Sequence, residues 1–232
     1  MRHAYSVAAV RAAEHSLLAQ QTFDDELMRL AARGVAATAT SMLDSGRHVT
    51  ILAGPGGNGG DGLYAGAFLA EEGYSVEAIL AADSAHDPAL EAFTAVGGTI
   101  AHDLGNADLL IDAVAGLAST RGLSGAPLRA YTEAKERGVP VLAVDIPSGI
   151  NADTGVAAAD AVKAEVTISF GWARAGHIFA PECGAVVLCD LRLPGAPRSF
   201  AEELSATAEP VGYIANEPTI PLPYQWPTKP VL

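Results

Sequence analysis

Apolar positions along the chain occur either in short continuous runs or at the spacing of an amphipathic helix. The continuous runs predict strands near residues 48–53, 75–81, 99–102, 109–114, 139–145, 164–170 and 185–191. The helical spacing predicts helices from about Ser6 to Gln20, from Asp24 to Leu43, and near 61–72, 87–96 and 125–137. Short buried strands that alternate with amphipathic helices are typical of a parallel sheet covered on both faces. We therefore expect an α/β domain with two helices at its N-terminus.

The densest run of glycines lies between the first predicted strand and the next helix. Residues 54–62 hold six glycines in nine positions. A backbone without side chains can approach a ligand closely, and the adjacent helix N-terminus attracts anions. This pattern favours a phosphate or nucleotide site, with a purely structural turn as the alternative. No Lys followed by Ser or Thr closes the loop, so it is not a P-loop.

A dehydrogenase-type dinucleotide site is a second interpretation of the same loop. Gly54, Gly56 and Gly59 satisfy G-x-G-x-x-G, and Asp83 follows the next strand about where a ribose-binding acid would sit. Against it, Asn58 and Asp61 add polar groups to the loop. We expect Asp61 to cap the helix, which would place a carboxylate where a dehydrogenase receives pyrophosphate.

Two later loops also follow predicted strands. Asp112 lies inside an apolar strand, so its carboxylate requires a cation, hydrogen-bond donors or the sheet edge; capping of a nearby turn is the alternative. The loop 116–122 is small, with hydroxyls and Arg121, and suits a phosphate or, alternatively, is an exposed loop without a ligand. Asp145 ends its strand before a Pro-Ser-Gly turn, as either a turn-capping or an acid–base residue.

All three loops leave the same edge of a parallel sheet, so they are expected to meet. The Asn58 amide, the Asp112 carboxylate and the Ser148 hydroxyl would then bring oxygen ligands of low net charge together, as a monovalent cation favours.

No Cys/His pattern for zinc occurs. The histidines are isolated and are expected at the surface or in the core: His3, His15, His48, His86, His102 and His177. The absence of G-x-S-x-G argues against a serine hydrolase.

The acidic composition argues against two classes of binding partner. The net charge of −13 and the pI of about 4.7 argue against binding to nucleic acid or to an anionic membrane surface. We expect Cys183 and Cys189 on one strand, about 20 Å apart, too far for a disulfide. Reduced thiols, no signal peptide and no transmembrane run favour the cytoplasm.

The last residues differ in character from the rest. Five prolines make helix or central strand improbable there: Pro218, Pro221, Pro223, Pro227 and Pro230. We expect a domain over 1–212 and an extended arm over 213–232, with Tyr213, Tyr224 and Trp226 as apolar anchors.

These motifs, taken together, resemble the YjeF N-terminal family, the NAD(P)H-hydrate epimerases. The resemblance covers about residues 5–195, and it is carried by Tyr5-Ser6-Val7, Leu27–Ala31, Gly54–Gly62, Ile111-Asp112-Ala113, Val144–Gly149, Asp153-Thr154-Gly155 and Ile168–Gly171. The glycine–asparagine loop followed at this spacing by Asp-Ile-Pro-Ser-Gly is far more specific than either motif alone.

The resemblance implies a Rossmann-like three-layer αβα sandwich, usually a homodimer, with a mostly parallel central sheet. It implies an isomerase that interconverts the R and S epimers of hydrated NADH and NADPH (NAD(P)HX), with potassium held by Asn58, Asp112 and Ser148. Asp145 would be catalytic and would also contact the substrate. The other substrate contacts would be Gly57, Asn58, Gly59, Gly60, Asp61, Gly116, Leu117, Ala118, Ser119, Thr120, Arg121 and Gly122. Functional coupling to an NAD(P)H-hydrate dehydratase is also implied.

The chain departs from the family pattern at Gly57, where an asparagine is usual, and at Ala115–Ala118, where Phe-Gly or similar is usual. The chemistry suits these residues, because the hydrate is a carbinolamine whose hydroxyl can leave, or whose ring can open, and close again on the other face. A carboxylate that shuttles a proton and stabilises the cation would suffice. A non-catalytic scaffold and an NAD-dependent oxidoreductase are the alternatives; the retained Asn58, Asp112, Asp145 and Ser148 favour the epimerase.

Overall fold

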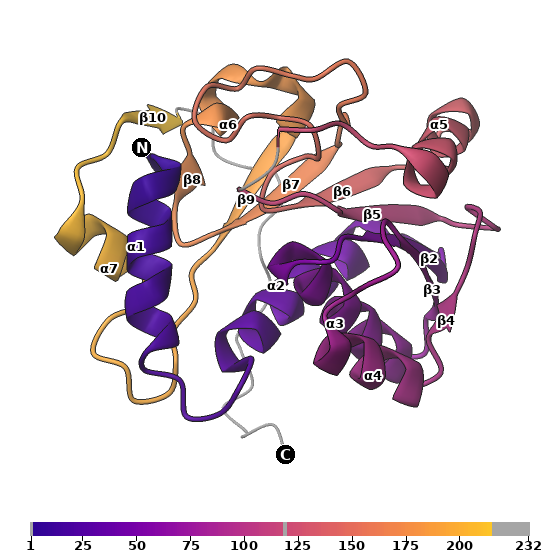
Figure 1. The fold of residues 1–232 in the computed structure, drawn as a ribbon, viewed down its shortest axis with the longest axis horizontal. Coiled ribbons are helices and arrows are strands. Elements are labelled where there is room, and N and C mark those ends of the chain that lie inside the picture. The colour runs from indigo at the N-terminus through magenta and orange to yellow at the C-terminus, as the bar shows by residue number, and fades with distance from the viewer. Residues whose placement is uncertain (1, 118–119, 215–232) are drawn as a thin grey trace.

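The computed structural model describes residues 2–117 and 120–214, which form an α/β fold around a parallel seven-stranded sheet (Figure 1). The strand order is β4-β3-β2-β5-β6-β7-β9. The strands are β2 (His48–Ala53), β3 (Ser75–Leu80), β4 (Thr99–Ile100), β5 (Leu109–Ala113), β6 (Val141–Val144), β7 (Val166–Phe170) and β9 (Ala185–Cys189). Each predicted strand is confirmed, although β4 and β6 are shorter than expected.

Helices cover both faces of this sheet, so the predicted three-layer sandwich is confirmed. On one face lie α2 (Glu26–Met42), α3 (Gly57–Glu71) and α4 (Asp87–Ala95), and on the other lies α5 (Gly125–Arg137) (Figure 1). Alternate strand residues point to opposite faces. Ile51 therefore packs into the larger core under α2 and α3, whereas its neighbour Leu52 packs into the smaller core under α5.

A second, three-stranded sheet lies beside the first and brings the two ends of the described chain together. Its order is β10-β1-β8, from β1 (Arg2–Tyr5), β8 (Ala173–Arg174) and β10 (Gly212–Ile214). Around it are α1 (Val7–Leu18), α6 (Gly176–Phe179), the 3-10 turn η1 (Pro181–Cys183) and α7 (Phe200–Thr207). Tyr213 of β10 packs edge-on against His3 of β1, with 5.2 Å between ring centroids. Residues 215–232, most of the expected arm, lie outside the described residues.

Two local predictions were wrong. Helix α3 begins at Gly57, four residues earlier than expected, so Asp61 is not its cap; Gly56 occupies that position without a side chain. Cys183 and Cys189 do not share a strand, because Cys183 belongs to η1 and Gly184, at a φ of +58°, turns the chain before β9. Both cysteines are nevertheless free and buried, as the prediction of reduced thiols requires. Within 2–117 and 120–214 no helix has the length and apolarity needed to cross a membrane.

Candidate active site

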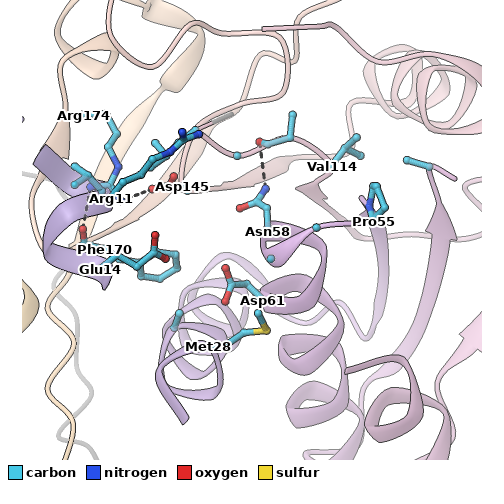
Figure 2. A pocket seen from close by; sticks show the side chains of 18 of the residues that line it. Arg11, Glu14, Met28, Pro55, Asn58, Asp61, Val114, Asp145, Phe170 and Arg174 are labelled. Carbon is cyan, nitrogen blue, oxygen red and sulfur yellow. Dashed lines mark hydrogen bonds and ion pairs between the residues drawn. The ribbon is translucent and has the colours of Figure 1, made fainter. Parts of the chain in front are cut away.

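The segments that follow β2, β5 and β6 meet at one edge of the main sheet, because these three strands are neighbours. A cavity of about 770 Å³ opens there, within the usual range for small-molecule sites. Helix α1 and Met28 of α2 close its other side (Figure 2). The predicted convergence of the three loops is thereby confirmed.

The glycine segment forms the floor of this cavity. A Cβ on Gly54 would lie 2.0 Å from the carbonyl oxygen of Val114, and one on Gly59 would lie 1.9 Å from that of Gly54, so neither position accepts a side chain. Gly56 offers no side chain to cap α3. The amides of the first helical turn, including those of Gly57 and Asn58 at the cavity wall, are therefore placed to bind an anion.

Asp112 lies behind the cavity wall in a network of hydrogen bonds. Its carboxylate is fully buried and accepts the Ser148 hydroxyl at 2.6 Å and the Ser148 amide at 2.7 Å, with a longer bond from the Val114 amide. Burial raises the pKa of Asp112, and these bonds act in the opposite direction. The Ser148 hydroxyl also accepts the Ala115 amide at 3.0 Å, and the Asn58 side-chain amide donates to the Ala115 carbonyl at 3.2 Å. The three predicted cation ligands thus belong to one connected cluster.

Asp145 faces the cavity from the end of β6 (Figure 2). It adopts a left-handed backbone, with a φ of +67°, which aspartate tolerates better than most residues. Its amide donates to the Ile168 carbonyl of β7 at 2.7 Å. The Asp145 carboxylate forms a 2.6 Å ion pair with the Arg174 guanidinium, and both residues are almost completely buried, at 7% and 2% exposed. The buried guanidinium fixes the position of this carboxylate.

His177 supports Asp145 from behind. Its Nδ1 accepts the Arg174 amide at 3.1 Å, so its Nε2 carries the proton and donates to the Asp145 carbonyl at 2.9 Å. Burial, and then the neighbouring Arg174 charge, lower the pKa of His177 to about 4. The imidazole is therefore uncharged near pH 7, and its hydrogen bond to the Asp145 carbonyl holds Asp145 in place.

Asp61 points into the cavity from α3, and Glu14 approaches it from α1 (Figure 2). Burial raises the pKa of Asp61 well above its usual range, and the carboxylates of Asp145, Glu14 and Asp25 add to this. The pKa of Glu14 is also raised, first by partial burial and then by Asp145, while Arg174 and Arg11 lower it. The cavity therefore concentrates acidic groups, as well as arginines, on its walls.

The structure brings together many of the residues expected to contact substrate, but not all. Those that line the cavity are Gly57, Asn58, Asp61, Gly116, Leu117, Arg121, Gly122 and Asp145. Gly59 and Gly60 are buried in α3, and Asp112 and Ser148 lie beneath the wall. Thr120 is exposed and does not line the cavity. Ala118 and Ser119 lie outside the described residues.

Sequence reasoning missed four residues at this site: Arg11, Glu14, Arg174 and His177. The sequence predicts only a helix at Arg11 and Glu14, and nothing in the local pattern indicates that α1 covers the cavity. Arg174 and His177 did carry a signal, because a charged and a titratable residue sit three apart among small apolar residues. A cluster of that kind indicates buried polar groups that need partners.

Comparison with known proteins gives the same family that the sequence motifs resemble. A model of the family described as YjeF-related protein N-terminus matches residues 24–176. The chain is similar to the bifunctional NAD(P)H-hydrate repair enzyme Nnr of Corynebacterium glutamicum, with 37% identity over 88% of this chain and 42% of that protein. It is similar to the NAD(P)H-hydrate epimerase of Microbacterium testaceum, with 40% identity over 82% of this chain and 78% of that protein.

The epimerase of Clavibacter michiganensis subsp. michiganensis is 35% identical over 82% of this chain and 90% of its own length. The crystal structure of the yeast protein ynu0 shares the fold, with a TM-score of 0.72 and 22% identity, over 90% of this chain and 96% of the yeast chain. The chain spans 42% of the length of the bifunctional relatives from Corynebacterium glutamicum and Mycobacterium leprae.

Proposed function

The chain belongs to the family of YjeF-related protein N-termini, and from that premise we propose that it epimerises hydrated NADH and NADPH. Relatives named for this activity match most of this chain, and two of them are matched over most of their own length. The observation that carries the proposal is the Asp145–Arg174 ion pair, which presents a fixed carboxylate to the cavity beside the N-terminus of α3.

The cavity floor supports the proposal that the site binds a nucleotide. The first-turn amides of α3 suit a phosphate of the hydrated dinucleotide, because they carry partial positive charge and lack a capping side chain. Arg11 and Arg121, which also line the cavity, add positive charge near this floor. Gly57, Asn58, Gly116, Leu117, Arg121 and Gly122 form the surrounding wall. Gly57 keeps that wall free of a side chain where the family usually has an asparagine.

The chemical step requires a cationic centre beside the ring nitrogen of the hydrate. Loss of the hydroxyl gives an iminium ion, whose two faces are open to water. The Asp145 carboxylate, already oriented by Arg174, would stabilise this positive charge without reorganising. His177 and Ser169 hold the residue in place from the sheet side.

We also propose that Asn58, Asp112 and Ser148 hold a potassium ion. The cluster offers oxygen atoms and a single formal negative charge, which matches a hard monovalent cation. Within 2–117 and 120–214 there is no group of three or more His, Cys, Asp or Glu side chains placed to hold a metal ion. A bound potassium ion would neutralise Asp112 and fix the segment after β5 against the glycine floor.

We also propose a compartment, a partner enzyme and an oligomeric state for the protein. Two buried free thiols favour the cytoplasm. The bifunctional relatives favour functional coupling to an NAD(P)H-hydrate dehydratase. A homodimer is proposed from the family resemblance, and the molar mass of the protein by light scattering tests it.

The experiment is a coupled assay. Purified protein is mixed with R-NADHX and an S-specific dehydratase, and complete consumption of the R epimer is expected. Absorbance of reduced nicotinamide should not change with the epimerase alone, since epimerisation is redox-neutral; a change would favour the oxidoreductase alternative.

Asp145→Asn should lower the rate by about 10²–10⁴-fold, because the charge is lost while the left-handed backbone is tolerated. The exposed Asp44→Asn is the matched control and should keep the wild-type rate. A near wild-type rate in Asp145→Asn would exclude Asp145 as the catalytic group.

A further inference from the structure

The glycines on both sides of Asp61 allow α3 to pack closely against its neighbours. A Cβ on Gly60 would lie 2.6 Å from the Met28 sulfur of α2, and a Cβ on Gly62 would lie 2.6 Å from the Ala113 Cβ of β5. The helix therefore approaches both elements at the distance of bare backbone. With those two sides occupied, the Asp61 side chain is directed into the cavity (Figure 2).

The Asp61 carboxyl group has no hydrogen bond or ion pair within the described ranges, 2–117 and 120–214. This sets it apart from the other two acids at the sheet edge. Asp112 has three donors, and Asp145 is paired with Arg174. A partly buried carboxyl that is held without a partner is expected to retain its proton.

Most of the charges around Asp61 raise its pKa. Three carboxylates face it from different elements, namely Asp145 after β6, Glu14 of α1 and Asp25 at the start of α2. The positive end of α3 opposes them. Arg174 is engaged by Asp145, while Arg11 of α1 and Arg121 lie on the cavity walls. Burial and the three acids together raise the pKa of Asp61 well above its usual range.

We propose that Asp61 is a second catalytic residue, a neutral carboxyl that donates its proton to the departing hydroxyl of the hydrate while the Asp145 carboxylate stabilises the cation. The inference rests on the proposed function and divides its chemistry between two acids of opposite state. Such a division, one protonated and one ionised carboxyl across a single cavity, is a general way to run acid catalysis near neutral pH.

The step balances without any other reactant. As the C–O bond breaks, the hydroxyl takes the Asp61 proton and leaves as water, and the lone pair of the ring nitrogen forms the C=N bond. Asp61 is then a carboxylate beside the iminium ion. A water molecule adds to the opposite face of the same carbon and gives up its proton to solvent, and Asp61 takes a proton back from solvent. The epimer is inverted, no electrons are gained or lost, and the hydroxyl oxygen now comes from solvent.

The first test compares Asp61→Asn with the matched control Asp44→Asn in the coupled assay. We expect kcat to fall by about 10²–10⁴-fold in Asp61→Asn with KM changed by less than about threefold, and Asp61→Glu to recover part of the loss. Since the ionised form is disfavoured in the fold, Asp61→Asn should also melt no lower than wild type at neutral pH. A wild-type kcat, or a lower melting temperature with only KM raised, would overturn the proposal.

The second test follows pH and oxygen. The wild-type rate should decline as rising pH removes the Asp61 proton, and that limb should be absent in Asp61→Asn. In ¹⁸O-water, the label should enter the hydroxyl in step with epimerisation; epimerisation that retains the original oxygen indicates ring opening and overturns the proposal. An active wild type with a fully active Asp61→Asn would overturn this inference alone, whereas an inactive wild type would overturn the proposed function as well.

Discussion

Asp112 on the sheet side of the cavity and Asp61 on the helix side are both carboxyl groups with raised pKa values, yet their surroundings differ completely. Asp112 accepts from Ser148 twice and from Val114, so each of its oxygens has a donor. Asp61 has no partner in the described part of the chain and is surrounded by other acids. Hydrogen bonds thus satisfy the Asp112 carboxyl group on the sheet wall, whereas the Asp61 carboxyl group on the helix wall has none within the described residues.

This difference gives the two residues different roles: Asp112 holds the cavity wall in position, and Asp61 is available to react. A satisfied buried carboxylate gives a rigid wall, because moving it would leave several hydrogen bonds unmade. An unsatisfied carboxyl at a cavity is unfavourable for folding, and it is available to a ligand that brings the missing partner. The following changes, in decreasing order of expected effect, test whether the two walls behave in these ways.

Ser148→Ala should be the most destabilising change. It removes the hydroxyl bond to Asp112 and leaves the Ala115 amide without its acceptor, for a loss of about 4 kcal/mol in the free energy of unfolding. It should also abolish any rise in melting temperature caused by potassium. Urea unfolding with and without KCl measures both, with the exposed Thr132→Ala as control. A loss below about 1 kcal/mol would contradict the rigid sheet wall.

His177 makes the sheet side sensitive to acid. Its pKa in the fold is about 4, below the ordinary value of 6.5, so the unfolded chain binds its proton first as pH falls. The stability contributed by neutral His177 is complete above pH 6.5 and is lost on the way to pH 4, a change of about 3 kcal/mol. Protonation of Asp61 and Asp112 acts in the opposite direction, so the measurement is the difference between wild type and His177→Gln across this range. Parallel stability curves would disprove the assignment.

Glu14→Gln should have the smallest effect, and in the opposite direction. The Glu14 side chain is exposed, although its carboxyl group approaches the cavity, so removing its charge near Asp145 and Asp61 should stabilise the fold by at most a few tenths of a kcal/mol at neutral pH. Thermal melting at low ionic strength measures it. A marked loss of stability would indicate that the helix side depends on Glu14, contrary to the comparison.

The sequence determines the main sheet well, because its strands are continuous apolar runs with helices of regular spacing between them. The second sheet could not be predicted in this way. Its strands β1, β8 and β10 have two to four residues, too few for a period to be detected, and they pair across almost the full length of the described chain.

The site was predictable where chemistry follows a strand. Asn58, Asp112, Asp145 and Ser148 all lie at the carboxyl ends of neighbouring strands, so topology alone places them together. Asp61 was misplaced because a glycine-rich segment was assumed to be a loop, whereas packing against α2 and β5 makes it the first turns of α3. The partners Arg174 and His177 depend on how β8 and α6 fold back, which no local pattern records.

The left-handed backbone of Asp145 restricts what evolution can do at this position. Glutamate would keep the charge but not the conformation, and glycine or asparagine would keep the conformation but not the charge. A lineage that abandons the chemistry can therefore drift to asparagine or glycine here within an intact domain. In a sequence collection, that substitution would mark descendants that retain the fold for some other purpose.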